Sequence, residues 1–148
     1  MQKILFIGAG LRRHENAIHQ DKRVLPGIDV VHDLEIFPWP FQSATYDKII
    51  AFDVIEHLTD IIRTIEECHR ILVPAGIMWI HTTYWNTKQS FTDPTHKHWF
   101  TENSFDFFCP GTFFGDNYGF YSACKFRKVE WYMEASEMVI VLEKRSEA

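Results

Sequence analysis

Residues 46–83 read as a strand, a helix and a second strand, and this order limits the fold more than any other feature of the sequence. Tyr46–Phe52 is apolar on both faces near its end, which is typical of a strand inside a parallel sheet. Apolar side chains at helical spacing follow it and predict an amphipathic helix over about 60–72. Ile77–Thr83 reads as the next strand. Alternation of this kind predicts an α/β fold with a mostly parallel, doubly wound sheet.

The ends of this helix carry boundary signals. Thr59 is placed to cap the first turn, and Asp60 lies where a carboxylate interacts favourably with the helix dipole. Arg70 falls in the last turn, and Pro74 and Gly76 predict the end of the helix. We therefore expect one crossover helix between the two strands.

Near the N-terminus, the segment between the first two expected strands is too short for a complete strand–helix–strand unit. Lys3–Ile7 reads as a buried strand that enters the turn Gly8-Ala9-Gly10, and Asn16–Gln20 and Ile28–Val31 read as two more strands. The gap between the turn and the second strand leaves no room for a helix. We expect a partly uncovered sheet there, unless an N-terminal extension, a loop or a second copy covers it. This favours a homodimer or an ordered partner.

The rest of the chain combines loops with a final pair of strands. Prolines exclude regular structure from 37–41, and Thr101 is placed to cap a short helix over 102–108. We expect loops over 84–97 and 111–119, and an antiparallel hairpin formed by 126–133 and 138–143. The expected fold is a single domain over residues 1–148. It is a Rossmann-like, doubly wound, mostly parallel sheet with a C-terminal antiparallel hairpin and reduced helices on the N-terminal side.

Composition narrows the class of protein. The 148 residues suit one domain, and the net charge of −5 argues against the basic face that nucleic acid requires. Cys68, Cys109 and Cys124 form no CxxC pair, which disfavours a disulfide framework or a zinc site. No run approaches the roughly 20 apolar residues of a membrane span, and the N-terminus lacks the pattern of a signal peptide. We expect a cytoplasmic protein that binds neither nucleic acid nor membrane.

Three places near predicted strand ends suit a nucleotide. The Gly8-Ala9-Gly10 turn lets backbone N–H groups approach a polar ligand, and such turns also serve as plain connectors. Asp21 ends the second strand, where a carboxylate either accepts the hydroxyls of a ribose or is a solvated turn residue. Asp33 is placed to accept from an exocyclic amine while Leu34 packs on the adenine, or else to form an Asx turn. The residue types alone leave these alternatives open.

Several motifs together resemble the class I S-adenosylmethionine-dependent methyltransferase superfamily, and within it compact members of the methyltransferase type 11 kind. They are DVVHDLEIFPWPF at 29–41, YDKII at 46–50, VIEHL at 54–58, RILVPAG at 70–76 and TDPTH at 92–96. The resemblance covers most of the chain. It implies that the cofactor is S-adenosyl-L-methionine and that S-adenosylhomocysteine is a product.

The resemblance also implies which positions hold the cofactor. Its methionine end is assigned to Gly8, Ala9 and Gly10, its ribose to Asp21, its adenine to Asp33 and Leu34, and its sulfonium region to Phe52 and Asp53. Two positions depart from the usual pattern. Phe6 stands where the family has an acidic or amide residue, and Leu11 stands where it often has a third glycine.

Glu56, His57 and His96 are the candidate catalytic residues. The resemblance places Glu56 and His57 at the methyl-transfer cleft. Transfer from a sulfonium needs mainly proximity and alignment, and a base only when the acceptor must lose a proton. His57 or His96 is the candidate base, although His57 is equally well read as a residue that caps or packs at the helix entry. No metal ion is required, and the loop context does not support a metal site made of Asp93, His96 and His98.

The expected function is therefore an S-adenosylmethionine-dependent methyltransferase that acts on a small-molecule or sugar-type acceptor. The alternative is a non-catalytic, degenerate Rossmann-like binding or assembly module, to which the departures at Phe6 and Leu11 point. A nicotinamide-dependent oxidoreductase fits less well, because the third glycine of its fingerprint is missing. Affinity for S-adenosylhomocysteine distinguishes the first two.

Overall fold

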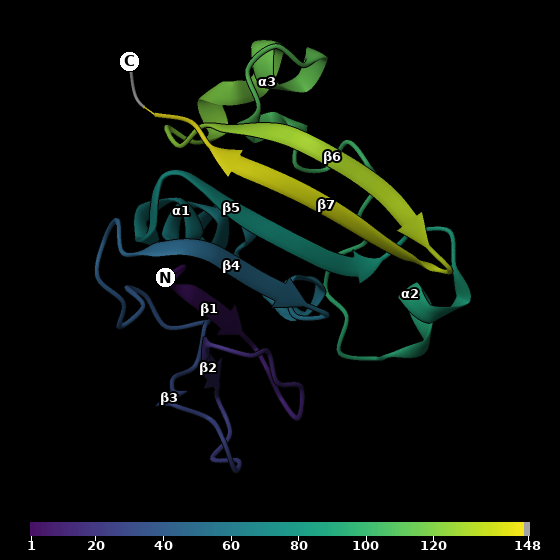
Figure 1. The fold of residues 1–148 in the computed structure, drawn as a ribbon. Coiled ribbons are helices and arrows are strands. Elements are labelled where there is room, and N and C mark those ends of the chain that lie inside the picture. The colour runs from purple at the N-terminus through teal and green to yellow at the C-terminus, as the bar shows by residue number, and fades with distance from the viewer. Residues whose placement is uncertain (147–148) are drawn as a thin grey trace.

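A seven-stranded sheet forms the centre of the computed structural model, which describes residues 1–146 (Figure 1). The strands lie in the order β3-β2-β1-β4-β5-β7-β6. They are β1 (Ile4–Ile7), β2 (Ala17–Asp21), β3 (Val30–Val31), β4 (Tyr46–Phe52), β5 (Leu72–Thr83), β6 (Phe126–Glu134) and β7 (Glu137–Lys144). The first five run parallel, β7 is antiparallel to β5, and β6 is antiparallel to β7. The predicted sheet with its C-terminal hairpin is confirmed.

Helices are few within residues 1–146, and only one exceeds two turns. They are α1 (Ile61–Ile71), α2 (Lys88–Thr92) and α3 (Phe113–Tyr118), with the 3₁₀ turns η1 (Ile55–His57), η2 (Asp106–Phe108) and η3 (Gly119–Tyr121). α1 is the predicted crossover helix between β4 and β5. Across the described residues, every helix is too short or too polar to cross a lipid bilayer.

Asp60, rather than Thr59, caps α1. The Asp60 carboxylate accepts a hydrogen bond from the Arg63 N–H at 2.9 Å. The Thr59 hydroxyl instead donates to the Glu35 carboxylate at 2.5 Å. The predicted cap is therefore wrong by one residue, because the Thr59 side chain is bound to Glu35 instead.

The end of α1 also differs from the prediction. Leu72 is already extended and begins β5, so Pro74 and Gly76 lie inside a strand. The residues between them form an irregularity in the pairing with β4, where Ala75 has a φ of +64°. A bulge of this kind accommodates proline in a sheet.

Three other local predictions are wrong. The expected loops over 84–97 and 111–119 contain α2 and α3, and the expected helix over 102–108 consists of turns that end in η2. Thr112 caps the start of α3, because its hydroxyl accepts from the Gly115 N–H at 3.0 Å. Helices of one or two turns are too short to show a hydrophobic period, so tertiary contacts decide where they form.

The two faces of the sheet are covered differently. On one face, Leu5, Ile49 and Met78 pack in a large core that includes Ile65 and Cys68 of α1. The smaller core on the opposite face contains no helical residue among those described. The short 10–16 connection that the sequence indicated is the reason (Figure 1).

Long side chains partly replace the missing helix. The Arg12 guanidinium lies 3.8 Å from the centre of the Phe52 ring, which suits both cation–π attraction and coverage by its aliphatic stem. A hollow of about 500 Å³ remains, lined by Phe6, Arg12, Arg13, His14, Lys48, Ile50, Phe52 and Trp79. The homodimer stays a prediction, which light scattering would test.

Candidate functional site

A cavity of about 750 Å³ opens at the carboxyl ends of β1, β2 and β4. Its lining is Gly8, Gln20, Asp21, Lys22, Arg23, Asp33, Leu34, Glu35, Val54, His57, Leu58, Asp93, Thr95 and Lys97. Ligands of doubly wound folds bind at this edge of the sheet. Five residues that the sequence singled out meet here, namely Gly8, Asp21, Asp33, Leu34 and His57.

Gly8 forms the floor of the cavity where β1 ends. Its φ is +57°, and a Cβ at this position would lie 2.4 Å from Val54 Cγ2, so only glycine fits. The Gly8 N–H donates to Gln20 Oε1 at 2.8 Å, and the Gln20 amide donates to the His32 carbonyl at 2.5 Å. Ala9 is buried in the opposite core and does not line the cavity.

Asp21 ends β2 with a buried carboxylate. Its Oδ2 accepts from the Gly10 N–H at 2.8 Å, and its Oδ1 accepts from the Arg23 N–H at 2.9 Å. Burial raises the pKa of Asp21, but these bonds and the Arg23 charge outweigh it and leave the pKa lowered. The carboxylate is therefore ionised at neutral pH, and Gly10 orients it rather than lining the cavity.

Asp33 and Leu34 form the opposite wall. Asp33 Oδ1 accepts from the Glu35 N–H at 3.0 Å, which is the Asx turn that the sequence left as an alternative. The side chain is exposed, so the turn places a carboxylate at the edge of the cavity. Leu34 is buried, and its carbonyl accepts from Trp39 Nε1 at 3.0 Å.

A polar rim, made of Glu35, Thr59 and Lys97, borders the same cavity. Thr59 donates to Glu35 through both its N–H at 2.9 Å and its hydroxyl at 2.5 Å. Lys97 Nζ donates to the Thr59 hydroxyl at 2.8 Å and lies 3.6 Å from Glu35 Oε2. Sequence analysis missed this rim, because no local pattern connects positions 35, 59 and 97.

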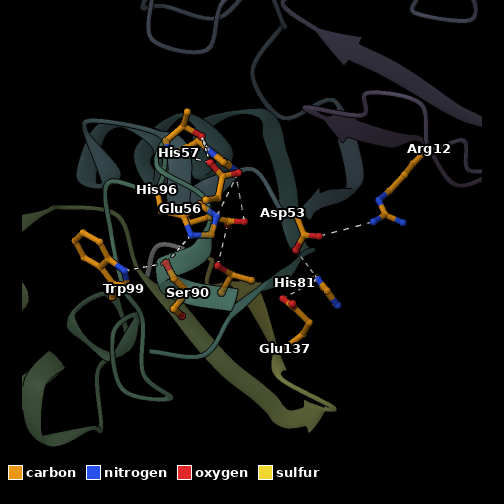
Figure 2. A network of polar contacts seen from close by, with 12 residues as sticks. Arg12, Asp53, Glu56, His57, His81, Ser90, His96, Trp99 and Glu137 are labelled. Carbon is orange, nitrogen blue, oxygen red and sulfur yellow. Dashed lines mark hydrogen bonds and ion pairs between the residues drawn. The ribbon is translucent and has the colours of Figure 1, made fainter. Parts of the chain in front are cut away.

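Glu56, His57 and His96 meet at one end of the cavity, and we call them the Glu56 cluster (Figure 2). The first two lie on η1, and His96 follows α2. Glu56 Oε1 is 4.0 Å from His57 Nε2, and the two imidazole centroids are 4.8 Å apart. Burial raises the pKa of Glu56 to about 7, while burial and the neighbouring His96 lower the pKa of His57. The fold thus assembles the candidate catalytic residues, although only His57 lines the cavity.

Asp53, His81 and Glu137 form a second group, the His81 cluster (Figure 2). His81 Nδ1 lies 2.8 Å from Asp53 Oδ1, and Arg12 lies 3.7 Å from Asp53 Oδ2. The Phe52 ring stacks on His81 with centroids 4.0 Å apart. Phe52 and Asp53 do not line the 750 Å³ cavity, so their role near a sulfonium stays a prediction.

Sequence comparison identifies a known domain within the chain. The family described as a methyltransferase domain matches residues 9–80. A protein of Mycolicibacterium smegmatis with the name "Probable S-adenosylmethionine-dependent methyltransferase" is 32% identical over 73 residues, or 49% of this chain. The matched part is 28% of that protein, so the chain spans little more than a quarter of its relative.

Solved structures with the same fold cover nearly the whole chain. An S-adenosylmethionine-dependent methyltransferase from Archaeoglobus fulgidus has a TM-score of 0.64 at 13% identity, over 97% of this chain and 86% of its own. The Burkholderia thailandensis 1,6-didemethyltoxoflavin-N1-methyltransferase, solved with 1,6-didemethyltoxoflavin and S-adenosylhomocysteine, has a TM-score of 0.65 at 14% identity, over 98% and 72%. Such identities establish the fold alone. The chain therefore has the fold of class I S-adenosylmethionine-dependent methyltransferases, and its residues 9–80 match the methyltransferase-domain family.

Proposed function

We propose that the chain acts as one methyltransferase domain, which transfers the methyl group of S-adenosylmethionine to a small-molecule acceptor, sugars included. The observation that carries this proposal is the convergence of Gly8, Asp21, Asp33 and Leu34 on one cavity. The cavity of about 750 Å³ falls within the range of roughly 300–1,000 Å³ that is usual for small-molecule sites.

The residues present fit the adenosine half of the cofactor. The Gly8 turn leaves a space that any Cβ would fill, and the ionised Asp21 carboxylate suits ribose hydroxyls. Arg23, whose side chain is exposed, would move aside from Asp21. Asp33 would accept from the adenine amine while Leu34 packs on the ring. Phe6 is buried against His19, so that position offers no polar group to the amino-acid end.

Bound S-adenosylmethionine supplies a methyl group that its sulfonium has already activated. An acceptor lone pair forms the bond to the methyl carbon, and the electron pair of the broken C–S bond remains on sulfur. The contribution of the chain is alignment and exclusion of water. We assign the acceptor side to His57, which lines the cavity, with Glu56 and His96 next to it.

Calorimetric titration with S-adenosylhomocysteine tests the cofactor site. We expect Asp21→Asn and Asp33→Ala each to weaken binding by about 10- to 100-fold, because each removes a charge-assisted hydrogen bond worth about 1.5–3 kcal/mol. Asp47→Asn is the matched control. Asp47 lies at the opposite, amino end of β4, where its carboxylate accepts from the Lys3 N–H at 2.7 Å.

The outcomes separate the two functions. Unchanged affinity in Asp47→Asn together with weakened binding in the other two variants supports the methyltransferase. A wild-type chain that binds no S-adenosylhomocysteine at millimolar concentration would favour the non-catalytic binding module and refute the proposal.

A further inference from the structure

The carboxylate of Glu56 and the imidazoles of His57 and His96 converge beside the cavity, and the proposed function gives them no ion to bind. We infer that Glu56, His57 and His96 bind a divalent transition-metal ion, which in turn contacts an oxygen of the acceptor. One ligand atom from each side chain lies within 4.8 Å of the other two. Tetrahedral zinc holds such atoms about 3.4 Å apart, so the side chains need to close by about 1 Å.

The hydrogen bonds around the cluster leave both imidazoles with a lone pair on Nε2. His96 Nδ1 lies 2.8 Å from the Ser90 carbonyl, which only accepts, so Nδ1 carries the proton. His57 Nδ1 lies 2.9 Å from Thr95 Oγ1, and that hydroxyl donates to Asp93 Oδ1 at 2.7 Å. The threonine oxygen therefore accepts from His57 Nδ1–H. Metal-bound histidines are oriented by outer partners of this kind.

The carboxylate is oriented in the same way. Thr82 donates its hydroxyl to Glu56 Oε2 at 2.8 Å, and Oε1 is the atom nearer to His57. The loop that carries His96 is attached to η1 through the main chain, since the Lys97 and His98 N–H groups donate to the Glu56 carbonyl at 2.7 and 3.2 Å. All three side chains are thus held before any ion arrives (Figure 2).

The charge of the cluster favours a cation. Glu56 is 1% exposed, and within residues 1–146 no lysine or arginine forms an ion pair with it. Asp93 Oδ2, 3.9 Å from His96 Nε2, adds a second carboxylate at the edge. A buried carboxylate without a positive partner is costly, so an ion would relieve the site.

The donor set indicates which ion and which acceptor. Two imidazoles and one carboxylate suit Zn²⁺ and other transition metals better than Mg²⁺ or Ca²⁺, and three protein ligands leave coordination positions open. His57 also lines the cavity, so an open position faces the proposed acceptor. The acceptor is then a hydroxylated small molecule.

The role of the ion in catalysis rests on the proposed function, whereas its binding does not. The ion lowers the pKa of the acceptor hydroxyl, whose proton passes to water. The oxygen lone pair then forms the bond to the methyl carbon, and the electron pair of the C–S bond remains on sulfur.

Titration of chelator-treated protein with ZnCl₂ alone, without cofactor, tests the site. We expect one Zn²⁺ per chain, and a loss of about 100-fold or more in affinity for both His57→Gln and His96→Gln. The controls are His98→Gln and His81→Gln, for which we expect wild-type affinity. His98 lies two residues from His96, but its Nε2 is engaged by the Thr59 carbonyl at 3.1 Å.

Circular dichroism establishes that each variant is folded. If His96→Gln does not fold, His57→Gln decides the question, because the His57 side chain is about one-third exposed. Absence of zinc binding by the wild type, wild-type affinity in His57→Gln, or an equal loss in His98→Gln overturns the inference. None of these readouts depends on S-adenosylmethionine, so the proposed function stands or falls separately.

Discussion

The Glu56 and His81 clusters contain the same kinds of side chain but use them differently. In the His81 cluster, the imidazole Nδ1 lies 2.8 Å from Asp53 and 3.9 Å from Glu137, and Arg12 adds a positive charge. In the Glu56 cluster, both Nδ1 atoms bond outward and no guanidinium or ammonium group pairs with the carboxylate within residues 1–146. The carboxylates of the His81 cluster are thus paired with His81 and Arg12, whereas the Glu56 cluster leaves imidazole lone pairs facing inward.

The difference shows that composition alone does not identify a metal site. The hydrogen-bond partner of each imidazole decides which nitrogen carries a proton, and therefore whether a lone pair is available. In the His81 cluster the atom nearest both carboxylates is the donor, so an ion would have to displace a proton.

The largest expected effect is on stability, from truncating the histidine of the His81 cluster. His81→Ala removes a buried ring that stacks on Phe52 and the hydrogen bond to Asp53. We expect the free energy of unfolding of chelator-treated protein to fall by about 2–4 kcal/mol in urea denaturation. His57→Ala should cost about 1 kcal/mol or less under the same conditions. Equal losses of unfolding free energy in the two variants would contradict this difference between the clusters.

A smaller effect of opposite sign is expected in the Glu56 cluster. Glu56→Gln replaces a buried carboxylate by a neutral amide of similar shape, and should raise the free energy of unfolding of metal-free protein by about 1–3 kcal/mol. ZnCl₂ at about 100 times its Kd should then stabilise the wild type by about 2.7 kcal/mol and leave the variant unchanged. A variant that is less stable than the metal-free wild type would contradict this account.

The smallest expected effect is a dependence on pH carried by His81. Burial lowers the pKa of His81, but its hydrogen bond to Asp53 and the charges of Asp53, Glu137 and Glu134 outweigh burial and raise it. The folded-state pKa thus lies above the unfolded value of 6.5, so the stabilisation is complete below pH 6.5 and is lost as the pH rises through the folded pKa. Arg12, the nearby cation, opposes this protonation.

The measurement is the difference in unfolding free energy between the wild type and His81→Gln, taken across pH 6 to 9. We expect the difference to shrink as the pH rises, since only the wild type releases this proton. A difference that is constant or grows would show that His81 is not protonated in the folded protein.

Strands with a continuous apolar run and helices with several turns of hydrophobic periodicity could be predicted from the sequence. Tyr46–Phe52 coincides with β4, and the apolar stripe located α1 to within one residue at each end. The motifs also indicated Asp21, Asp33 and Gly8, and these do share a cavity. Local patterns and resemblance sufficed here because each of these residues is positioned by its own strand end.

What sequence reasoning missed depends on contacts between distant segments. Lys97 reaches Thr59 and Glu35, and Thr59 is thereby lost as a helix cap. The stacking of Phe52 with Trp79 and His81 depends in the same way on neighbouring strands, and the role of Phe52 at the cofactor stays a prediction. The pairing of His96 with Glu56 likewise depends on how a loop docks, which no spacing in the sequence reveals.

The two N–H groups that meet the Glu56 carbonyl have a consequence for how this protein could diversify. A hydrogen bond donated by a main-chain N–H does not depend on the side chain of the donor residue. Positions 97 and 98 could therefore accept other residues during evolution without displacing the neighbouring imidazole at 96, provided that proline is avoided. Since Lys97 lines the cavity, substitutions at position 97 could change which proposed acceptor fits without moving the imidazole of residue 96.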